Sequence, residues 1–448
     1  MIDVARRAVE AALVAGASDA EAYASEDAGR EVRVHGGAVE SLTAATQRGV
    51  GVRAWIGHRV GYAYGTDFSE RGIAGLASRA AEAAAVADED ECAAPPEAGV
   101  EPAEDLRLRD ASLSEWTTDR VADLALAVER AALAADPRIA GVEQAVYADS
   151  DERIAIASST GIGGEFERSS CHAYVQALAE GDGGRETGLG FDLGRGPTAL
   201  DPAAIGREGA ERATAMIGSV KPGSRTCPVV LDPTVAASFV ALIGRGLAAA
   251  AVQRGRSPFA GQIGTAVAGS ALTLHDDGLD PGGFASAPFD GEGIPRGRTA
   301  LIEQTTLRTY LHDTYTARRG QAASTGNASR SGYRSQPSVS PSNLIVAPGT
   351  LSFDGLLGEA NEGVLVTDVA GLHSGVNPVS GVFSVGASGQ AIRGGELAEP
   401  LREFTIASDL VSMLGAVREA GRDPRWVPFG GSVSTPALLI GEMTVAGS

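Results

Sequence analysis

The chain has 448 residues, of which 44% are hydrophobic and 21% are charged, and its formal net charge is −20. This length is sufficient for two or three domains with substantial cores. This large excess of acidic residues argues against nucleic-acid binding as the main activity, because contacts with phosphates need a basic surface.

The N-terminal part of the chain is predicted to form a helix, several strands and a second helix. Within residues 3–15 the apolar residues recur at helical spacing and would lie on one face of a helix. Gly16 follows and is expected to end this helix. Over residues 20–66 apolar and polar residues alternate between glycine-containing turns, which predicts antiparallel strands. Ser69 is then expected to cap a helix that runs to about Ala87.

A second set of helices and strands follows an acidic segment. Residues 88–110 carry proline and many carboxylates but no apolar period, so we interpret them as an exposed linker. Ser112 and Glu115 have the spacing of a capping box ahead of a helix. Apolar and polar residues alternate again over residues 138–191, which predicts further strands. Residues 199–218 are rich in Ala and have the spacing of a helix.

The C-terminal half opens with a strand and a helix. Residues 228–231 are a short β-branched run that ends at Asp232. The apolar stretch from Val235 to Val252 has small residues at helical spacing, which predicts a buried helix. Beyond Gly278 almost nothing is helical by pattern, and short apolar runs alternate with turn residues.

These patterns predict an α+β fold with two domains. Residues 1–221 would form an N-terminal domain of antiparallel strands and helices. Its sub-regions, 1–87 and 111–221, would be joined by the acidic linker. Residues 222–448 would form a strand-rich domain that contains one buried helix.

The cysteines and the apolar segments indicate the cytoplasm. Cys92, Cys171 and Cys227 are widely spaced and odd in number, which favours a reducing compartment over a disulfide framework. The first residues lack a separate basic region and an uninterrupted apolar core, so we expect no signal peptide. The longest apolar run is interrupted by Arg245, so no membrane span is expected.

Several sequence blocks carry a resemblance to a known family. The block GRGLAAAAVQRGRSPFAGQIG lies within residues 227–277, and FDGEGIPRGRTALIE, PSNLIVAPG and GLHSGVNPVSGVFSVGASG follow it in order. In this combination the chain resembles the TldD/PmbA family of zinc metallopeptidases, once called modulators of DNA gyrase. The resemblance covers nearly the whole chain and is strongest from residue 227 onward.

The resemblance also locates the family's catalytic positions. In catalytic, TldD-type members this helix carries a His-Glu-x-x-x-His motif, in which the histidines bind zinc and the glutamate acts as general base. The flanking residues place these positions at Val240, Ala241 and Arg245. Val and Ala have no lone pair, and Arg is not deprotonated to bind a cation. The late cysteine that completes the zinc site is also missing, because no cysteine follows Cys227. The chain therefore resembles the zinc-free PmbA (TldE) branch.

The spacing of the histidines bears on metal binding independently of the family. No two of the six histidines have the spacing of a metal-binding pair on a helix. The best remaining cluster joins His275, Asp276 and Asp277 with the distant His312 and Asp313. We interpret it as a polar turn, and an enzyme with a relocated metal site stays open as a further hypothesis.

The resemblance implies a role without a metal in this chain. A TldD-like partner would supply the zinc, and the two chains would enclose an unfolded peptide held by strand addition. Candidate contacts with the peptide or the partner are found in two loops. One loop carries Arg254, Arg256 and Ser257, and the other carries Val376, Asn377 and Pro378. For both loops an ordinary turn without specific contacts stays open.

A second function from a different class stays open as well. The chain would then be a stand-alone interaction or regulatory protein, forming a homodimer and lacking peptidase activity. A neighbouring TldD-type chain with an intact motif would favour the peptidase subunit. Its absence from the source would favour the stand-alone protein.

Overall fold

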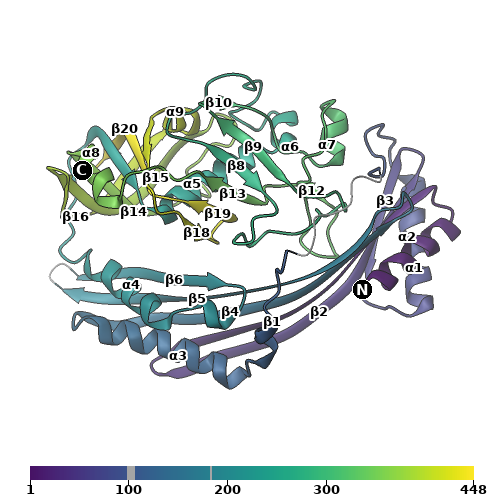
Figure 1. Cartoon of the computed structure of the whole chain (residues 1–448), viewed down its shortest axis with the longest axis horizontal. Helices are drawn as coiled ribbons and strands as arrows, with labels where there is room; N and C mark the ends of the chain where they lie inside the picture. The colour runs from purple at the N-terminus through teal and green to yellow at the C-terminus, as the bar shows by residue number, and fades with distance from the viewer. Residues whose placement is uncertain (98–105, 182–183, 448) are drawn as a thin grey trace. The chain divides into compact units, whose positions relative to one another are not determined.

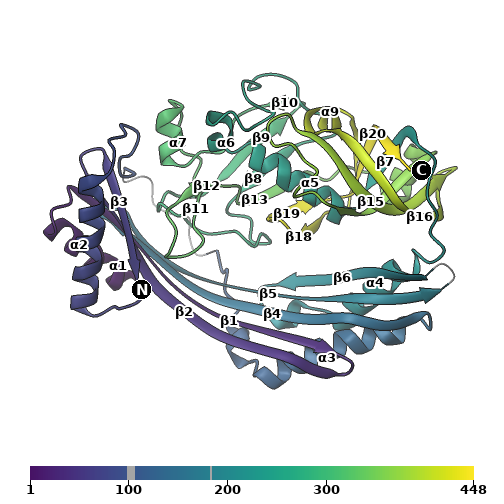
Figure 2. The same ribbon diagram turned by 180° about the vertical axis from the view of Figure 1, so that it is seen from behind.

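The computed structural model describes residues 1–97, 106–181 and 184–447. They form two compact units (Figure 1 and Figure 2). The first unit contains Met1–Ile217, Ala287–Pro295 and Ser329–Ser338, and the second contains Gly218–Ser286, Arg296–Ala328 and Val339–Ser448. The domain division predicted at residue 221 stays a prediction, because compactness does not establish independent folding.

The first unit is built on a six-stranded sheet with the order β3-β2-β1-β4-β5-β6. All of its neighbouring strands are antiparallel, as predicted from the alternation of apolar and polar residues. The strands are β1 (Asp19–His35), β2 (Ala38–Ile56), β3 (Arg59–Gly65), β4 (Ile139–Ser158), β5 (Gly163–Gly181) and β6 (Gly184–Gly194).

Four α-helices pack on this sheet. They are α1 (Ile2–Val14), α2 (Glu70–Val86), α3 (Thr118–Ala135) and α4 (Pro202–Thr214), and two 3-10 helices cover Ala111–Glu115 and Pro197–Ala199. The helices expected before Gly16 and after Ser69 are confirmed, and Ser69 Oγ accepts a hydrogen bond from Gly72 N at 3.1 Å. The Ala-rich helix begins later than expected, because Asp201 accepts hydrogen bonds from Ala203 N and Ala204 N.

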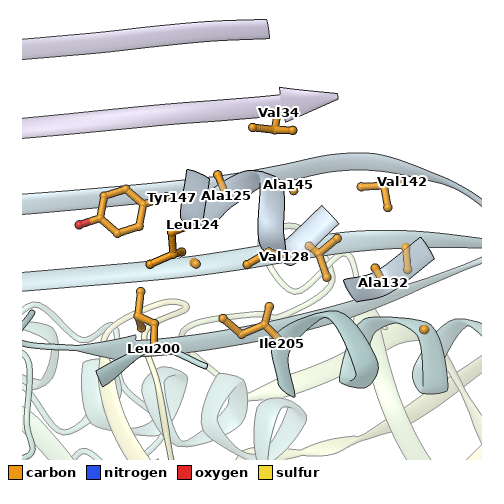
Figure 3. Close-up of a cluster of buried hydrophobic side chains, with 14 of the residues drawn as sticks. Val34, Leu124, Ala125, Val128, Ala132, Val142, Ala145, Tyr147, Leu200 and Ile205 are labelled. Atoms are coloured by element: carbon orange, nitrogen blue, oxygen red, sulfur yellow. The ribbon is translucent and has the colours of Figure 1, made fainter. Parts of the chain in front are cut away.

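The helices bury two separate clusters of apolar side chains. Around α3 and α4, Leu124 and Val128 meet Tyr147 and Ile205 (Figure 3). Around α1 and α2, small side chains predominate, and Leu76 is among the larger members. Even-numbered residues near the two ends of β1 contribute to these clusters: Ala20, Ala22 and Ala24 to the one around α1 and α2, and Val32 and Val34 to the one around α3 and α4. This face of β1 is therefore the one that the helices cover.

The capping box predicted at Ser112 and Glu115 is wrong. Residues 111–115 form a 3-10 helix in which Asp110 accepts a hydrogen bond from Ser112 N at 2.9 Å. The α-helix starts only after Trp116, whose extended backbone interrupts the turn. Thr117 is the actual cap and accepts a hydrogen bond from Arg120 N at 3.3 Å. Two capping patterns compete here, and the one nearer the apolar run starts the helix.

The predicted linker lies partly outside the described residues. Residues 88–97 are irregular, and residues 98–105 are not described. Leu108 is buried, and Arg109 forms an ion pair with Asp151 at 2.7 Å. The end of the segment is therefore held against the sheet, and the linker interpretation stays a prediction.

Glu21, an odd-numbered residue of β1, belongs to a network of buried charges. Arg53 on β2 lies 2.6 Å from Glu21 and 3.0 Å from Glu292, measured from Nη2 to the nearest carboxylate oxygen. Arg330 Nη2 donates to the other oxygen of Glu21. All four side chains are at most 10% exposed. Two segments from the C-terminal half, 287–295 and 329–338, are thus tied to the sheet of the first unit.

Two glycines on β2 let segment 329–338 approach the sheet. A Cβ atom on Gly49 would lie 2.3 Å from the ring of Tyr333. A Cβ atom on Gly51 would lie 2.1 Å from Tyr62 Oη and 2.4 Å from Tyr333 O. Any side chain at either position would push this segment away.

The second unit contains two six-stranded sheets. One has the order β16-β15-β14-β7-β20-β17, and a further pairing between β16 and β20 closes it into a barrel. The other has the order β10-β9-β8-β13-β19-β18. The strands of this sheet are β7 (Arg225–Leu231), β14 (Gly363–Ala370), β15 (Val382–Arg393), β16 (Glu396–Asp409), β17 (Val417–Ala420) and β20 (Leu438–Ala446), and all of them except β17 belong to the closed ring.

The other strands of this half of the chain are short, as the scattered apolar runs predicted. They are β8 (Leu274–Asp277), β9 (Arg298–Glu303), β10 (Thr306–Leu307), β11 (Ala328–Ser329), β12 (Ser338–Val339), β13 (Asn343–Val346), β18 (Arg425–Val427) and β19 (Ser432–Thr435). The predicted α+β class, with a strand-rich C-terminal region, is confirmed.

The predicted buried helix is shorter than expected. It divides into α5 (Pro233–Gly246) and α6 (Ala249–Gln253). The break occurs because Ala248 is extended, while Leu247 and Ala249 exchange backbone hydrogen bonds with Leu311. The prediction of almost no helix beyond Gly278 is also wrong in detail. The short helices α7 (Thr314–Arg319), α8 (Phe353–Ala360) and α9 (Leu410–Gly415) occur there.

Among the helices that the structure describes, none combines the length and the apolar composition needed to cross a bilayer.

Candidate functional site

Helix α5 is the element on which the candidate site is built (Figure 2). It follows β7 directly, and it begins at Pro233 because Asp232 Oδ1 accepts a hydrogen bond from Thr234 N at 2.9 Å. It contacts β7 and β14 of the barrel as well as β13 and β19 of the second sheet. The helix is therefore buried between two sheets.

The packing around α5 is tight. The ring of Phe239 lies 5.0 Å from the ring of Phe383, between centroids. A Cβ atom on Gly244 would lie 2.3 Å from Leu344 Cδ1. The helix therefore meets its neighbours with small residues and leaves little room for larger side chains.

The structure does not bring the three motif positions together. Val240 and Ala241 are 2% and 3% exposed, whereas Arg245 is exposed. Positions five residues apart on an α-helix are rotated by about 140° from each other. Arg245 is therefore rotated by about 140° from Val240 but by only about 40° from Ala241, so the three side chains do not share one face of the helix.

A loop missed by the sequence analysis lies against Ala241. It joins β18 to β19 through residues 428–431, and a Cβ atom on Gly430 would lie 3.7 Å from Ala241 Cβ. Gly430 and Gly431 both have positive φ, at 83° and 149°. This glycine pair is the signal that the sequence offered for a tight loop. None of residues 428–431 has a side-chain donor atom suited to a metal.

The residues at this site do not fit a zinc ion. Zinc is bound by thiolate, imidazole or carboxylate groups. Val240 and Ala241 have none of these groups, and the guanidinium of Arg245 is positively charged. In the described ranges, which omit residues 98–105, 182–183 and 448, no group of three or more His, Cys, Asp or Glu residues could hold a metal ion.

The first predicted contact loop begins at the end of α6. Arg254 and Arg256 are exposed, whereas Ser257 is 6% exposed. Ser257 Oγ donates to Gly246 O at 2.6 Å and accepts a hydrogen bond from Phe259 N at 3.0 Å. Ser257 thus closes the C-terminal end of α5, and only the two arginines present their side chains to solvent. The predicted peptide or partner contacts of all three stay a prediction.

The second predicted contact loop is a tight turn ahead of β15. Asn377 Oδ1 accepts hydrogen bonds from Val379 N at 2.9 Å and Ser380 N at 3.2 Å. Asn377 and Pro378 are exposed, while Val376 is partly buried and pairs with Phe383. The predicted contacts of Val376, Asn377 and Pro378 stay a prediction.

The structure brings the two predicted loops together. A Cβ atom on Gly381 would lie 3.1 Å from Pro258 Cβ, so the turn at residues 376–380 lies beside the segment that follows Arg256. These segments are more than a hundred residues apart in the sequence. Sequence spacing gave no sign of this proximity.

The polar cluster around His275 forms a hydrogen-bonded core. Asp276 is 1% exposed and accepts hydrogen bonds from Ser342 N at 2.7 Å and from Asn327 Nδ2 at 2.7 Å. Burial raises the pKa of the Asp276 carboxyl. His275 Nδ1 lies 3.4 Å from Arg298 Nη2. Burial and this neighbouring positive charge lower the pKa of His275, which favours the neutral imidazole over the protonated ring.

The buried histidines predict a loss of stability in acid. Burial lowers the pKa of His275 and His312 below the ordinary value of 6.5, so the unfolded chain binds protons more readily as the pH falls through that value. The free energy of unfolding should therefore fall below pH 6.5. Urea unfolding at neutral and at mildly acidic pH measures this change. The free energy of unfolding should fall less on acidification in His275→Gln or His312→Gln than in the wild type. The exposed His373→Gln serves as control, and an unchanged fall in both buried variants would contradict this prediction.

Three family models match successive parts of the chain. PmbA/TldA metallopeptidase domain 1 matches residues 20–84, and the central domain matches residues 111–217. The C-terminal domain matches residues 224–447, which span half of the 448 residues. The chain belongs to the PmbA/TldD metallopeptidase family. The resemblance seen in the sequence blocks is thus confirmed, and α5 lies within the family's C-terminal domain.

Relatives and solved structures agree with this membership in the PmbA/TldD family. The chain is 28% identical to the metalloprotease PmbA of Escherichia coli O157:H7, over 97% of this chain and 94% of that one. It is similar to a Thermotoga maritima protein described as a candidate modulator of a DNA gyrase. The TM-score is 0.91 and the identity 26%, over 98% and 99% of the two chains. TldE from Thermococcus kodakarensis has a TM-score of 0.91 at 21% identity, over 99% of both chains, which shows the fold alone.

Proposed function

We propose that this chain is a non-catalytic, cytoplasmic subunit of a PmbA/TldD-type metallopeptidase. It helps to bind and enclose an unfolded peptide, and a TldD-like partner supplies the zinc, its ligands and the general base. Hydrolysis then follows water activation at the partner's metal. The role of this chain is to hold the peptide and to exclude bulk water.

The observation that supports this proposal is the composition of α5. Its motif positions hold two buried apolar side chains, Val240 and Ala241, and one exposed guanidinium, Arg245. None of the three activates water or binds a cation. Membership in a metallopeptidase family, combined with a motif that lacks every metal ligand, favours a partner that performs the chemistry.

The turn at residues 376–380 and the exposed Arg254 and Arg256 support a binding role. They lie beside each other at the surface of the second unit, close to the end of α5. Two arginines at a surface attract carboxylates of a peptide or of a partner chain. Strand addition would hold an extended peptide mainly through its backbone, so sequence preference would be low.

Metal analysis combined with peptide cleavage tests the proposal. The chain is purified alone and after co-expression with a TldD-like partner, and an unstructured peptide is the substrate. We expect zinc and cleavage only in the complex, and about a hundredfold slower cleavage by the partner alone, because incomplete enclosure leaves the peptide poorly positioned. Equal cleavage by the partner without this chain would overturn the proposal.

The same experiment addresses the alternative functions. A chain that forms no complex and leaves cleavage unchanged would be a stand-alone interaction or regulatory protein. A lone chain that binds zinc and cleaves the peptide would be an enzyme with a relocated site. Loss of that zinc in His275→Gln or His312→Gln would locate the relocated site.

A further inference from the structure

Four exposed arginines lie at the C-terminal ends of three helices of the second unit, α5, α6 and α7. Together they form the arginine cluster: Arg245, Arg254, Arg256 and Arg319. In the part of the chain that the structure describes, no ion pair joins any of the four to a carboxylate. Their charges are therefore left to solvent.

A side-chain hydrogen bond joins the end of α5 to the segment after α6. Ser257 Oγ donates to Gly246 O at 2.6 Å, and Ser257 is buried. Arg256 precedes the serine and Arg245 precedes the glycine, so each arginine is one residue from this contact. The two guanidinium groups thus belong to the same part of the surface.

A second hydrogen bond joins α6 to α7, which lie side by side (Figure 1 and Figure 2). Gln253 Nε2 donates to Thr316 O at 2.7 Å, and a Cβ atom on Gly320 would lie 3.3 Å from the same nitrogen. Arg254 follows Gln253, and Arg319 precedes Gly320. The third and fourth arginines are therefore neighbours as well.

The surroundings of the arginine cluster lack exposed acidic residues. The chain has 57 Asp and Glu residues, yet segments 233–275, 304–328 and 371–395 contain only Asp313. Asp313 is 5% exposed and caps α7, and Asp409 on β16 is similarly held by backbone N–H groups of α9. On a chain with a net charge of −20, this surface is a local positive patch.

Helix dipoles make the cluster tolerable without neutralising it. Arg245 and Arg319 lie in the last turns of α5 and α7, where the negative end of the helix stabilises a cation. Four like charges in one place nevertheless repel one another. An anion bound across the cluster relieves this repulsion, and a guanidinium binds a carboxylate through two parallel hydrogen bonds.

The apolar surface beside the cluster is small. A Cβ atom on Gly381 would lie 3.1 Å from Pro258 Cβ, so the turn at residues 376–380 borders the segment after Arg256. Val379 and Val382 are 53% and 54% exposed there. A stable subunit interface buries about 800 Å² of each partner around a largely apolar centre, which two valines do not supply. This composition suits a short charged peptide better than a folded partner.

We propose that the arginine cluster binds an acidic segment of the peptide substrate, so that peptides with adjacent Asp or Glu residues are preferred. The guanidinium groups pair with the carboxylates, and apolar side chains next to them lie against Val379 and Val382. Strand addition gives little sequence preference, so this preference comes from side chains. The word substrate rests on the proposed function, whereas the binding surface belongs to this chain alone.

Binding of two matched peptides to the purified chain tests the inference. Both are unstructured and fluorescently labelled, and they differ only in a central Glu-Glu-Asp-Glu or Gln-Gln-Asn-Gln. The net charge of −20 by itself favours the amide peptide, whereas the cluster should make the acidic peptide bind about tenfold more tightly at low salt. Added salt should reduce this difference. Equal affinities at low salt, or tighter binding of the amide peptide, would overturn the inference.

A double substitution locates the preference. Arg254→Gln/Arg256→Gln removes two of the four charges and should reduce the preference to less than about twofold, with circular dichroism unchanged. Arg6→Gln/Arg71→Gln changes exposed residues of α1 and α2, has the same net charge and should retain the preference. A preference that is lost in both variants, or in neither, contradicts a site at the arginine cluster.

Assays with a TldD-like partner separate the inference from the proposed function. The complex should cleave the acidic peptide faster, and Arg254→Gln/Arg256→Gln should remove this advantage. If this chain prefers the acidic peptide but the partner cleaves equally without it, only the proposed function fails. If the double variant no longer associates with the partner but still prefers the acidic peptide, the inference fails and the cluster belongs to the subunit interface.

Discussion

Replacing Arg53 by Met is expected to lower the free energy of unfolding by about 3–5 kcal/mol. Arg53 is the cation shared by Glu21 and Glu292, at 2.6 Å and 3.0 Å, and its side chain is only 10% exposed. With Arg330 the network contains two positive and two negative groups, so it is neutral. The substitution leaves two buried carboxylates with one arginine, and burial of this excess charge destabilises the fold.

Urea unfolding of the whole chain measures the effect, and a partly exposed arginine on β1 provides the control. Arg33 lies 3.7 Å from Glu31, and the two side chains are 41% and 51% exposed. Arg33→Met should therefore change stability by less than about 0.5 kcal/mol. Adding Glu292→Gln to Arg53→Met removes the excess charge and should recover part of the loss. Equal effects of Arg53→Met and Arg33→Met would show that the network does not stabilise the fold.

Restoring the family's motif in α5 is expected to destabilise the chain without creating a zinc site. In Val240→His/Ala241→Glu/Arg245→His, two larger polar groups enter positions that are 2% and 3% exposed. The new Glu at position 241 would meet the loop at Gly430, whose Cβ would lie only 3.7 Å from the Ala241 Cβ. Overpacking and a buried carboxylate together should lower the free energy of unfolding by about 3 kcal/mol or more.

Urea unfolding and metal analysis of this triple variant give the two readouts. The third ligand of the family's zinc site would still be missing, because no cysteine follows Cys227, so stoichiometric zinc is not expected. Arg245→His alone changes an exposed side chain and should stay within about 0.5 kcal/mol of the wild type. A triple variant that holds zinc at unchanged stability would show that the site can be rebuilt by substitution alone.

Local periodicity explains why much of the fold was predictable. The apolar residues at helical spacing ahead of Gly16 identify α1. The alternation of apolar and polar residues across residues 20–66 identifies the first strands, because each element must turn one face to a core. The errors occur where two local signals compete or where a distant contact intervenes. Ser112 and Thr117 both offer a helix cap, and only the second lies next to the apolar run. The helix breaks at the extended Ala248, where Leu247 O and Ala249 N form hydrogen bonds with Leu311.

The loss of metal ligands at the candidate site follows from the sequence by itself. The identities of Val240, Ala241 and Arg245 exclude metal binding in any conformation, because a side chain's lone pairs and charge do not depend on the fold. The family was also recognisable from ordered blocks of sequence, and the family models that match the chain confirm it.

Only the tertiary structure decided which distant segments meet. Arg330 binds Glu21 across 309 residues of sequence, and Gly430 lies against Ala241. Such contacts depend on close backbone approach and on charge pairing between elements, and neither leaves a period in the local sequence. The sequence alone thus determined the chemistry that α5 lacks, whereas the tertiary structure determined what packs against it.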